Sequence, residues 1–290
     1  MKNKRYLCAF LGLFLCSCNI GFGKIQINYQ KSEQYQVASE VAFDNSMLNK
    51  IEINWISGNV SIVSLESPSL QIIENSQYDL KETEKMHYLV DMNKIIIYPT
   101  AEGTFSSKIL NKSLTISIPS NWTMQEVSID VVSSNVEFNN TSNIDRIDVN
   151  NVSGRISLDN GKINNLEIDC VSGNVSIENT SINTCNLNVV SSECVFRTST
   201  ISSIQNETVS GDIELNGVNF DSCDFDTISG NIKLYLIEDI GYSIYFSSVS
   251  GKVSDKLKCH YEGDKYILGN AQKIINIDTV SGDLLIDSEK

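Results

Sequence analysis

The sequence predicts an all-β fold, a single-stranded parallel β-helix (a β-solenoid, expected to be right-handed) with about 19–21 residues per coil. Three observations predict this fold. A short phrase of the type "VSGNVSI" recurs nine times along the 290 residues. Apolar residues around each copy alternate with polar residues at a period of two, which is strand spacing. The spacing of 3.5 or 3.6 residues that would indicate helices does not occur.

The chain begins with a segment typical of a secretory signal. Residues 1–17 contain a basic start, an apolar run from Tyr6 to Leu15 and small residues after it. A run of that length is too short to span a bilayer. The ending "LCSC" resembles the bacterial lipobox, which implies cleavage after Ser17 and lipidation of Cys18. The protein would then be held to a bacterial membrane through acyl chains. An ordinary secretory signal, cleaved nearby, is the alternative.

The next two regions are expected to have different structures, a tether and a folded cap. Residues 18–40 are polar with little periodicity and are predicted to be a tether. Residues 41–128 are predicted to be an irregular β region that caps the solenoid, because they hold all three prolines and strand-like words such as "KSLTISIP". A cap of this kind is needed, since an open terminal coil exposes unpaired backbone groups.

The regular array is expected to occupy residues 129–290. With the Val or Ile that opens each phrase taken as position 0, the copies begin at residues 56, 132, 152, 171, 190, 209, 228, 249 and 280. The steps between 132 and 249 are 19 to 21 residues. The step from 56 to 132 is 76, four times 19, and the last step is 31, which indicates an insertion within "CHYEGDKYILGNAQK".

The alternation around each phrase predicts which side chains face the core. Positions −5, −3, +4, +6 and +11 are apolar in nearly every copy. We expect these five columns to point inward, with successive coils stacked about 4.8 Å apart. Ser always follows position 0, and Gly or Ser comes next. Both residues suit a tight corner, so Val171 is interpreted as inward, with Ser172 and Gly173 turning the chain. A ladder of serine hydroxyls that binds sugar or ice-like water is the alternative.

The cysteines of the array are predicted to be free thiols. They are Cys170, Cys185, Cys194, Cys223 and Cys259, and an odd number does not make a complete disulfide framework. Cys185 and Cys223 share an inward column but stand two coils apart, about 10 Å, which is beyond disulfide reach.

Two outward columns carry carboxylates and amides. Position −4 holds Asp148, Glu167, Asn186, Gln205 and Asp224, and position −2 holds Asn150, Asp169, Asn188, Glu207 and Asp226. One interpretation is weak, multi-site binding of a cation, with Ca²⁺ the best match to hard oxygen ligands. The other, which we favour, is a solvated face with amide ladders, because the sequence holds no compact Asp-x-Asp-x-Asp-Gly loop. The residues of a weak cation-binding or ligand-binding face would be Asp148, Asn150, Glu167, Asp169, Glu207, Asp224 and Asp226.

The net charge and the lack of catalytic motifs in the sequence narrow the classes of function expected for this protein. The formal net charge of −14 becomes −17 once Lys2, Lys4 and Arg5 leave with the signal, so nucleic acids and anionic lipid headgroups are poor partners. The basic residues Arg146, Arg155, Lys162 and Arg197 fall in different columns, and the sequence shows no phosphate loop, nucleophile elbow or HExxH motif. We therefore expect no catalytic residues, no cofactor and no enzyme activity.

Several short sequence motifs of this chain resemble those of a known family. The "I-x-I-x-x-x-S-G-x-V-x-I" opening (residues 51–62), the "LTISIP" strand (residues 114–119) and the following "VSG-x-I-x-L" series resemble the bacterial "putative adhesin" β-strand-repeat family, a domain of unknown function. The resemblance covers roughly residues 45–290. It implies a β-helix exposed at the cell envelope and gives no catalytic residues to carry over.

The sequence therefore predicts a non-catalytic, surface-exposed lipoprotein of the bacterial cell envelope, located outside the cytoplasm. Its body would be an adhesin-like β-solenoid scaffold that binds a glycan or protein partner. The alternatives are an accessory protein of envelope stress signalling that partners a membrane protein, and a carbohydrate-active β-helix enzyme.

Overall fold

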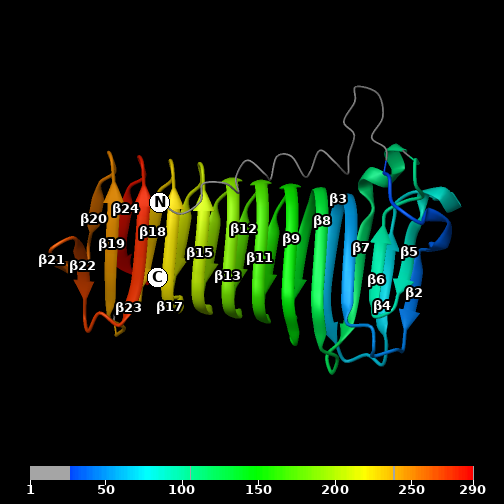
Figure 1. The fold of residues 1–290 in the computed structure, drawn as a ribbon, viewed down its shortest axis with the longest axis horizontal. Helices are drawn as coiled ribbons and strands as arrows, with labels where there is room; N and C mark the ends of the chain where they lie inside the picture. The colour runs from blue at the N-terminus through cyan, green and yellow to red at the C-terminus, as the bar shows by residue number, and fades with distance from the viewer. Residues whose placement is uncertain (1–26, 105, 238, 290) are drawn as a thin grey trace.

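The computed structural model of the chain describes residues 27–104, 106–237 and 239–289. It is a row of stacked β coils with a larger cap at the N-terminal end and a smaller one at the C-terminal end (Figure 1). Cys18 and the signal lie outside the described residues. Within the described ranges no helix is long or apolar enough to cross a membrane. The helical elements described there are three short 3₁₀ turns, η1 (Ser32–Gln34), η2 (Glu82–Glu84) and η3 (Ser107–Asn111).

One parallel sheet runs the length of the stack and carries positions −6 to −1 in the regular coils. Its strands, in spatial order, are β6 (Lys94–Tyr98), β3 (Lys50–Leu65), β8 (Met124–Asn139), β9 (Ile144–Ser153), β11 (Lys162–Ser172), β13 (Ser181–Ser191), β15 (Thr200–Thr208), β17 (Asn219–Thr227), β23 (Lys273–Thr279) and β19 (Tyr242–Ser248).

A second parallel sheet faces the first across the core. It contains β7 (Ser113–Pro119), the later halves of β3 and β8, β10 (Ile156–Asp159), β12 (Val175–Glu178), β14 (Cys194–Arg197), β16 (Ile213–Asn216), β18 (Ile232–Leu236), β24 (Leu284–Ser288) and β20 (Val253–Asp255). The parallel β-solenoid expected from the repeat is therefore confirmed.

The predicted inward columns form one continuous core. At position +4, for example, Ile156, Val175, Cys194 and Ile213 are at most 1% exposed. The coil-to-coil register matches the repeat, since Val175 pairs with Ile156 on one side and Cys194 on the other. All five cysteines of the array are free thiols, four of them buried, as predicted. Burial raises the pKa of the Cys194 thiol to about 12, so this thiol stays protonated and inert.

The interpretation of Val171 as inward is wrong. The first strand of each coil runs on through position −1, where Cys170 is fully buried. The strand period of two then points position 0 outward, and Val171 is partly exposed. Position −1 is Trp, Val, Asn, Cys, Thr or Ser in different copies. This mixture hid an inward column from the sequence pattern.

The glycines of the phrase stand where neighbouring coils come closest. A Cβ atom built on Gly211 would lie 2.0 Å from the carbonyl oxygen of Ser192 in the next coil, and one on Gly230 would lie 2.0 Å from that of Gly211. Both distances are far below contact distance, and the obstacle is backbone that cannot rotate away. Glycine is therefore required here by close approach between coils.

We expect Gly211→Ala to destabilise the protein by about 1–3 kcal/mol, because the added methyl group forces two coils apart. The adjacent exposed residue supplies a matched control, and Ser210→Ala should leave stability unchanged. The measurement is the urea midpoint of both variants. Equal midpoints for Gly211→Ala and the original protein would contradict this packing.

At the N-terminal end of the solenoid, the spatial order of the strands differs from their order in the sequence. β3 lies directly against β8, with Val60 beside Val136, although 76 residues separate them in the sequence. The spacing of four times 19 therefore does not reflect intervening coils. The residues between β3 and β8 extend outward as a cap: β4 (Leu70–Asn75) pairs antiparallel with β7 and with β2 (Glu40–Phe43), and β5 (Met86–Asp91) pairs antiparallel with β6 and with β1 (Gln36–Ala38).

The described part of the predicted tether belongs to this cap as well. β1 lies within residues 18–40 and forms part of the cap sheet. Tyr29 stacks on Tyr98 at a ring-centroid distance of 4.1 Å. Residues 27–40 therefore pack on the solenoid and do not form a separate tether.

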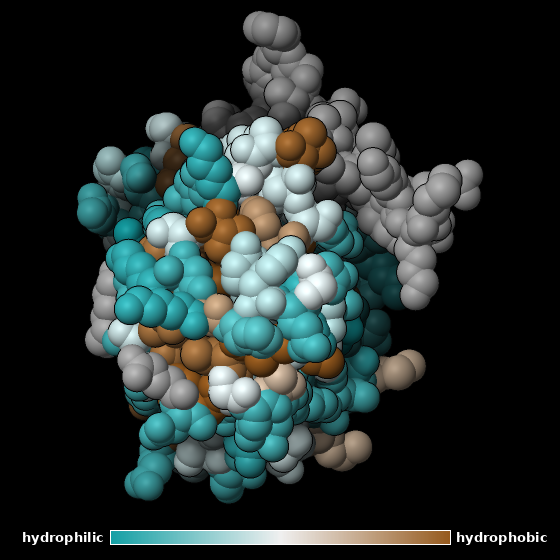
Figure 2. All heavy atoms as spheres, turned by 90° about the vertical axis from the view of Figure 1, so that its left-hand side faces the viewer, coloured by the Kyte–Doolittle hydropathy of each residue, from teal (hydrophilic) through white to brown (hydrophobic). Residues whose placement is uncertain are grey.

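At the C-terminal end, the spatial order of the strands also differs from their order in the sequence. The last coil, β23 with β24, fits between β17–β18 and β19–β20. The predicted insertion forms the hairpin β21 (His260–Glu262) and β22 (Lys265–Leu268), and β22 pairs antiparallel with β19. Figure 2 views the molecule from this end and shows apolar surface between polar side chains. Val249, which is 83% exposed, and Tyr261 are exposed apolar residues of this region.

Candidate functional site

The predicted acidic and amide columns stand as expected on the outer surface of the first sheet. Glu167 pairs with Asp148 and Asn186, and Asp169 pairs with Asn150 and Asn188. The same pairing continues through β15 and β17, where the columns contain Glu207, Asp224 and Asp226. The two columns extend further than the regular repeats do. Their members outside residues 148–226 are Glu52, Ser128, Asn276 and Tyr245 at position −4, and Asn54, Asp130, Asp278 and Ser247 at position −2.

Amides and carboxylates of neighbouring coils bind one another along these columns. The side-chain amide of Asn150 donates to Asp130 at 2.8 Å, that of Asn188 to Asp169 at 2.7 Å, and that of Asn276 to Asp224 at 2.6 Å. Arg146 adds a bridge, donating to Asp148 at 3.2 Å and to Glu167. These bonds occupy oxygens that a cation would need.

A cation site on this face stays a prediction. In the part of the chain that the structure describes, no group of three or more His, Cys, Asp or Glu side chains is placed to hold a metal ion. A Ca²⁺ ion prefers six to eight oxygen ligands. Within the described residues, amides separate several of the carboxylates along the columns, and no three carboxylates converge on one point.

Several carboxylates of the columns are harder to ionise than usual. Burial raises the pKa values of Asp130, Asp148 and Asp169, although in each case a hydrogen bond from Asn150, Arg146 or Asn188 acts in the opposite direction. The pKa of Asp226 is raised by burial and then by the nearby charges of Asp278 and Asp224. Keeping these four carboxylates charged at neutral pH therefore costs the folded state free energy, mainly through burial and at Asp226 also through repulsion.

We expect the protein to become more stable as the pH falls from 7 toward 3.8, the ordinary aspartate value. A raised pKa means that the folded state takes up a proton at a higher pH than the unfolded chain does. Protonation of these four aspartates therefore favours folding as the pH falls through their raised values. The check is the thermal midpoint as a function of pH.

The matched variant for this prediction is Asp226→Asn, which removes one titrating group and the repulsion from Asp278 and Asp224. Its midpoint at pH 7 should rise, and its dependence on pH should be shallower. A midpoint that falls steadily between pH 7 and pH 5 would contradict the prediction.

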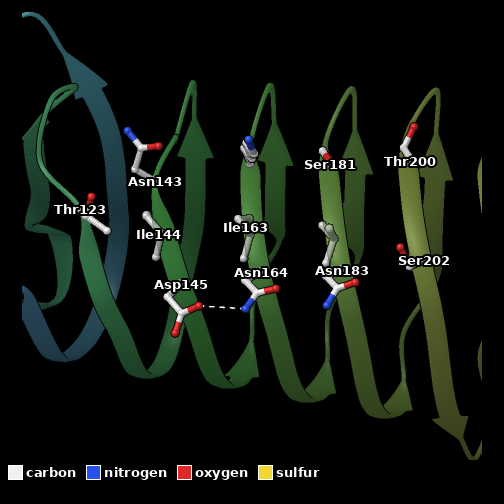
Figure 3. Close-up of a pocket in the computed structure, with 12 residues that line it drawn as sticks. Thr123, Asn143, Ile144, Asp145, Ile163, Asn164, Ser181, Asn183, Thr200 and Ser202 are labelled. Carbon is white, nitrogen blue, oxygen red and sulfur yellow. Dashed lines mark hydrogen bonds between the residues drawn. The ribbon is translucent and has the colours of Figure 1, made fainter.

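A shallow groove crosses four coils at the start of β9, β11, β13 and β15. Its volume is about 430 Å³, and Figure 3 shows its lining. The floor consists of stacked isoleucines that are at most 3% exposed, namely Ile144, Ile163 and Ile182. The rims are polar side chains, mostly amides and hydroxyls, with the charged Asp145 and Lys162 among them. One or two come from each coil: Thr123, Asn143, Asp145, Lys162, Asn164, Ser181, Asn183, Thr200 and Ser202.

The polar groups of the groove form a row with the period of the solenoid. Asp145, Asn164, Asn183 and Ser202 occupy matching places on successive coils (Figure 3). Asn164 donates to Asp145 at 2.9 Å. The groove therefore presents similar hydrogen-bonding groups at intervals of about 4.8 Å, which suits an extended polymer better than a compact molecule.

Sequence reasoning missed this groove, although its signal is present. The words "KIN", "SIN" and "TIS" at residues 162–164, 181–183 and 200–202 each place one isoleucine between two polar residues. The inward column at position +11 predicts the isoleucines, whereas the Asn, Ser and Thr residues beside them are ordinary surface residues and do not by themselves predict a site.

A long solenoid with repeating polar surfaces defines a class of extended, scaffold-like β proteins. Within that class, the Toastrack DUF4097 family model matches residues 81–287, more than half of the chain. The chain belongs to this family. The family and the fold expected from the sequence words are thus confirmed.

Solved structures share the fold at low sequence identity. A protein from Bacteroides fragilis described as "a putative adhesin" is 13% identical, with a TM-score of 0.52, and the match covers 85% of this chain and 96% of that one. A "putative lipid binding protein" from Parabacteroides distasonis is 12% identical, with a TM-score of 0.51 and the same two coverages, 85% and 96%. Among proteins with curated descriptions, none matches this chain.

Proposed function

We propose that the protein is a non-catalytic, surface-exposed lipoprotein of the bacterial cell envelope. Its β-solenoid would act as an adhesin-like scaffold that binds an extended glycan or protein partner. The observation that carries the proposal is the groove across β9, β11, β13 and β15, in which each coil offers a similar amide or hydroxyl above an isoleucine floor. One structural neighbour is described as "a putative adhesin" and the other as a "putative lipid binding protein", and both descriptions support a binding role.

A glycan array probed with the full-length protein tests the binding role. We expect retention of a glycan without release of product, and loss of retention in Asn164→Ala/Asn183→Ala. The matched control is Ser157→Ala/Ser176→Ala, on the outer surface of the second sheet, which should bind as the original does. Release of a shortened glycan would overturn the non-catalytic assignment. If the groove variant retains the glycan as strongly as the unmodified protein does, the glycan-binding site lies outside the groove.

The anchor is tested separately. Labelling of growing cells with an acyl analogue should mark the original protein and leave Cys18→Ala unmarked. Labelling that persists in Cys18→Ala, or that never occurs, would remove the lipid anchor from the proposal.

A further inference from the structure

The outward turn of position 0 creates an aliphatic stripe along the whole stack. We call this stripe the position-0 column; in spatial order it contains Ile56, Val132, Val152, Val171, Val190, Val209, Ile228, Val280 and Val249. From Val132 to Val209 these side chains are partly exposed, and the last three are 50%, 48% and 83% exposed. A continuous aliphatic stripe on a solenoid surface is a feature of interaction surfaces.

The first residue of this column is already covered by the chain itself. Ile56 is only 7% exposed because Ile27, Tyr29 and Ile109 pack on it. The neighbouring Ser57 donates its hydroxyl to the carbonyl oxygen of Leu110. At this one coil, then, a polypeptide supplies both an aliphatic side chain for position 0 and a carbonyl oxygen for the serine beside it.

Among the residues that the structure describes, this cover ends at the next coil. A small cavity of about 80 Å³ lies between Ile27 on the covering side and Ile56 and Val132 on the solenoid side. Beyond it, the serines that follow position 0 remain exposed at Ser172, Ser191 and Ser210 and elsewhere along the column. The same pair of groups that binds polypeptide at Ile56 and Ser57 is thus repeated along the described coils without such a cover. The hydroxyls of Ser153, Ser250 and Ser281 donate instead to position-0 carbonyl oxygens of the neighbouring coil.

The column also has a charged border. Position −2, two residues earlier on the same strands, carries Asp130, Asp169, Glu207, Asp226 and Asp278. A partner that lies on the valines therefore meets carboxylates along one edge. Anionic lipid headgroups would be repelled there, whereas lysine or arginine side chains would be attracted.

We infer that the position-0 column is a docking strip for an extended polypeptide segment of a partner protein, with aliphatic side chains facing the valines and basic side chains reaching the position −2 carboxylates. The partner's backbone carbonyl oxygens accept from exposed serine hydroxyls such as those of Ser172, Ser191 and Ser210, as Leu110 does from Ser57. This inference rests on the proposed binding role and names a second site, apart from the groove.

The test uses a labelled, terminally blocked (Lys-Val)₄ peptide and the full-length protein, with fluorescence anisotropy as the readout. We expect binding of this peptide and no binding of (Glu-Val)₄. Binding of (Lys-Ser)₄ should be about tenfold weaker or worse, because the aliphatic contact is lost. Equal binding of (Lys-Val)₄ and (Lys-Ser)₄, or no binding of either, would overturn the docking strip.

Matched variants locate the site. Val171→Ser/Val190→Ser removes two outward side chains from the column and should weaken (Lys-Val)₄ binding about tenfold, with an unchanged thermal midpoint. Val90→Ser removes a valine that is 41% exposed but lies off the column, and it should bind as the original does. Equal binding by the two variants would overturn the assignment.

The two proposals fail in different ways. A glycan array without retention leaves the peptide result standing. A glycan whose retention is lost in Val171→Ser/Val190→Ser, while (Lys-Val)₄ fails to bind, assigns the column to carbohydrate and overturns the polypeptide partner.

Discussion

Ile213→Asp is expected to unfold the central coils. The side chain of Ile213 is 1% exposed and stacks between Cys194 and Ile232 of the adjacent coils. An aspartate there loses the buried aliphatic group and brings a carboxylate into a core of aliphatic and thiol side chains. We expect a loss of about 4–5 kcal/mol or more, at the upper end of what single substitutions cause.

The measurement is urea unfolding combined with amide hydrogen exchange. Because each coil is stabilised by its neighbours, protection should fall first in β14, β16 and β18 and less at the ends. Ile213→Val keeps the column apolar and should cost only about 0.5–1.5 kcal/mol. A folded Ile213→Asp protein with an unchanged midpoint would mean that position +4 does not face the core.

The inward columns could be predicted because they follow from local rules. A strand period of two and a coil period of 19 to 21 residues fix which side chains face inward, and they also fix which residues of neighbouring coils stand side by side. The prediction that Asp148 lies beside Glu167, and Asn150 beside Asp169, follows from the same two periods and is confirmed by the strand register. These relations involve only neighbouring coils.

The order of the terminal coils could not be predicted from the same rules. All coils share one pattern of columns, so β3 fits equally well against any coil in that register. The spacing of 76 residues is compatible both with three intervening coils and with direct contact. The choice depends on how residues 66–123 fold among themselves into antiparallel pairs, which is long-range information that the repeat does not contain.

The functional surfaces were harder to predict because outward columns carry weak constraints. Carboxylates and amides at positions −4 and −2 stood out by their chemistry. The groove did not, since Asn, Ser and Thr at its rim are ordinary surface residues. Val171 is predicted to face inward because a valine looks like a core residue, and the same resemblance hides the rest of the position-0 column. Only the continuation of the strand through buried Cys170 shows that they face outward.

The N-terminal cap depends on a buried ion pair that the sequence pattern gave no reason to expect. Lys112 is completely buried, and its Nζ atom lies 2.5 Å from Oε1 of Glu74, whose side chain is 1% exposed. The same ammonium group donates to the carbonyl oxygens of Glu84, at 2.7 Å, and Pro99. It also lies 5.3 Å from the ring centroid of Trp55. Four segments of the cap thus converge on one charge.

Lys112→Met is therefore expected to cost about 3–5 kcal/mol, because it leaves the Glu74 carboxylate buried without its counterion. Loss of the cap should expose the edge of β3, so we also expect concentration-dependent aggregation. The double variant Lys112→Met/Glu74→Gln removes both charges and keeps an oxygen for the backbone amide of Met86, which donates to Glu74 at 3.0 Å. It should recover at least half of the loss. Urea unfolding of Lys112→Met, Glu74→Gln and the double variant gives the coupling energy between the two side chains. Losses of stability that simply add would show that the ion pair does not hold the cap together.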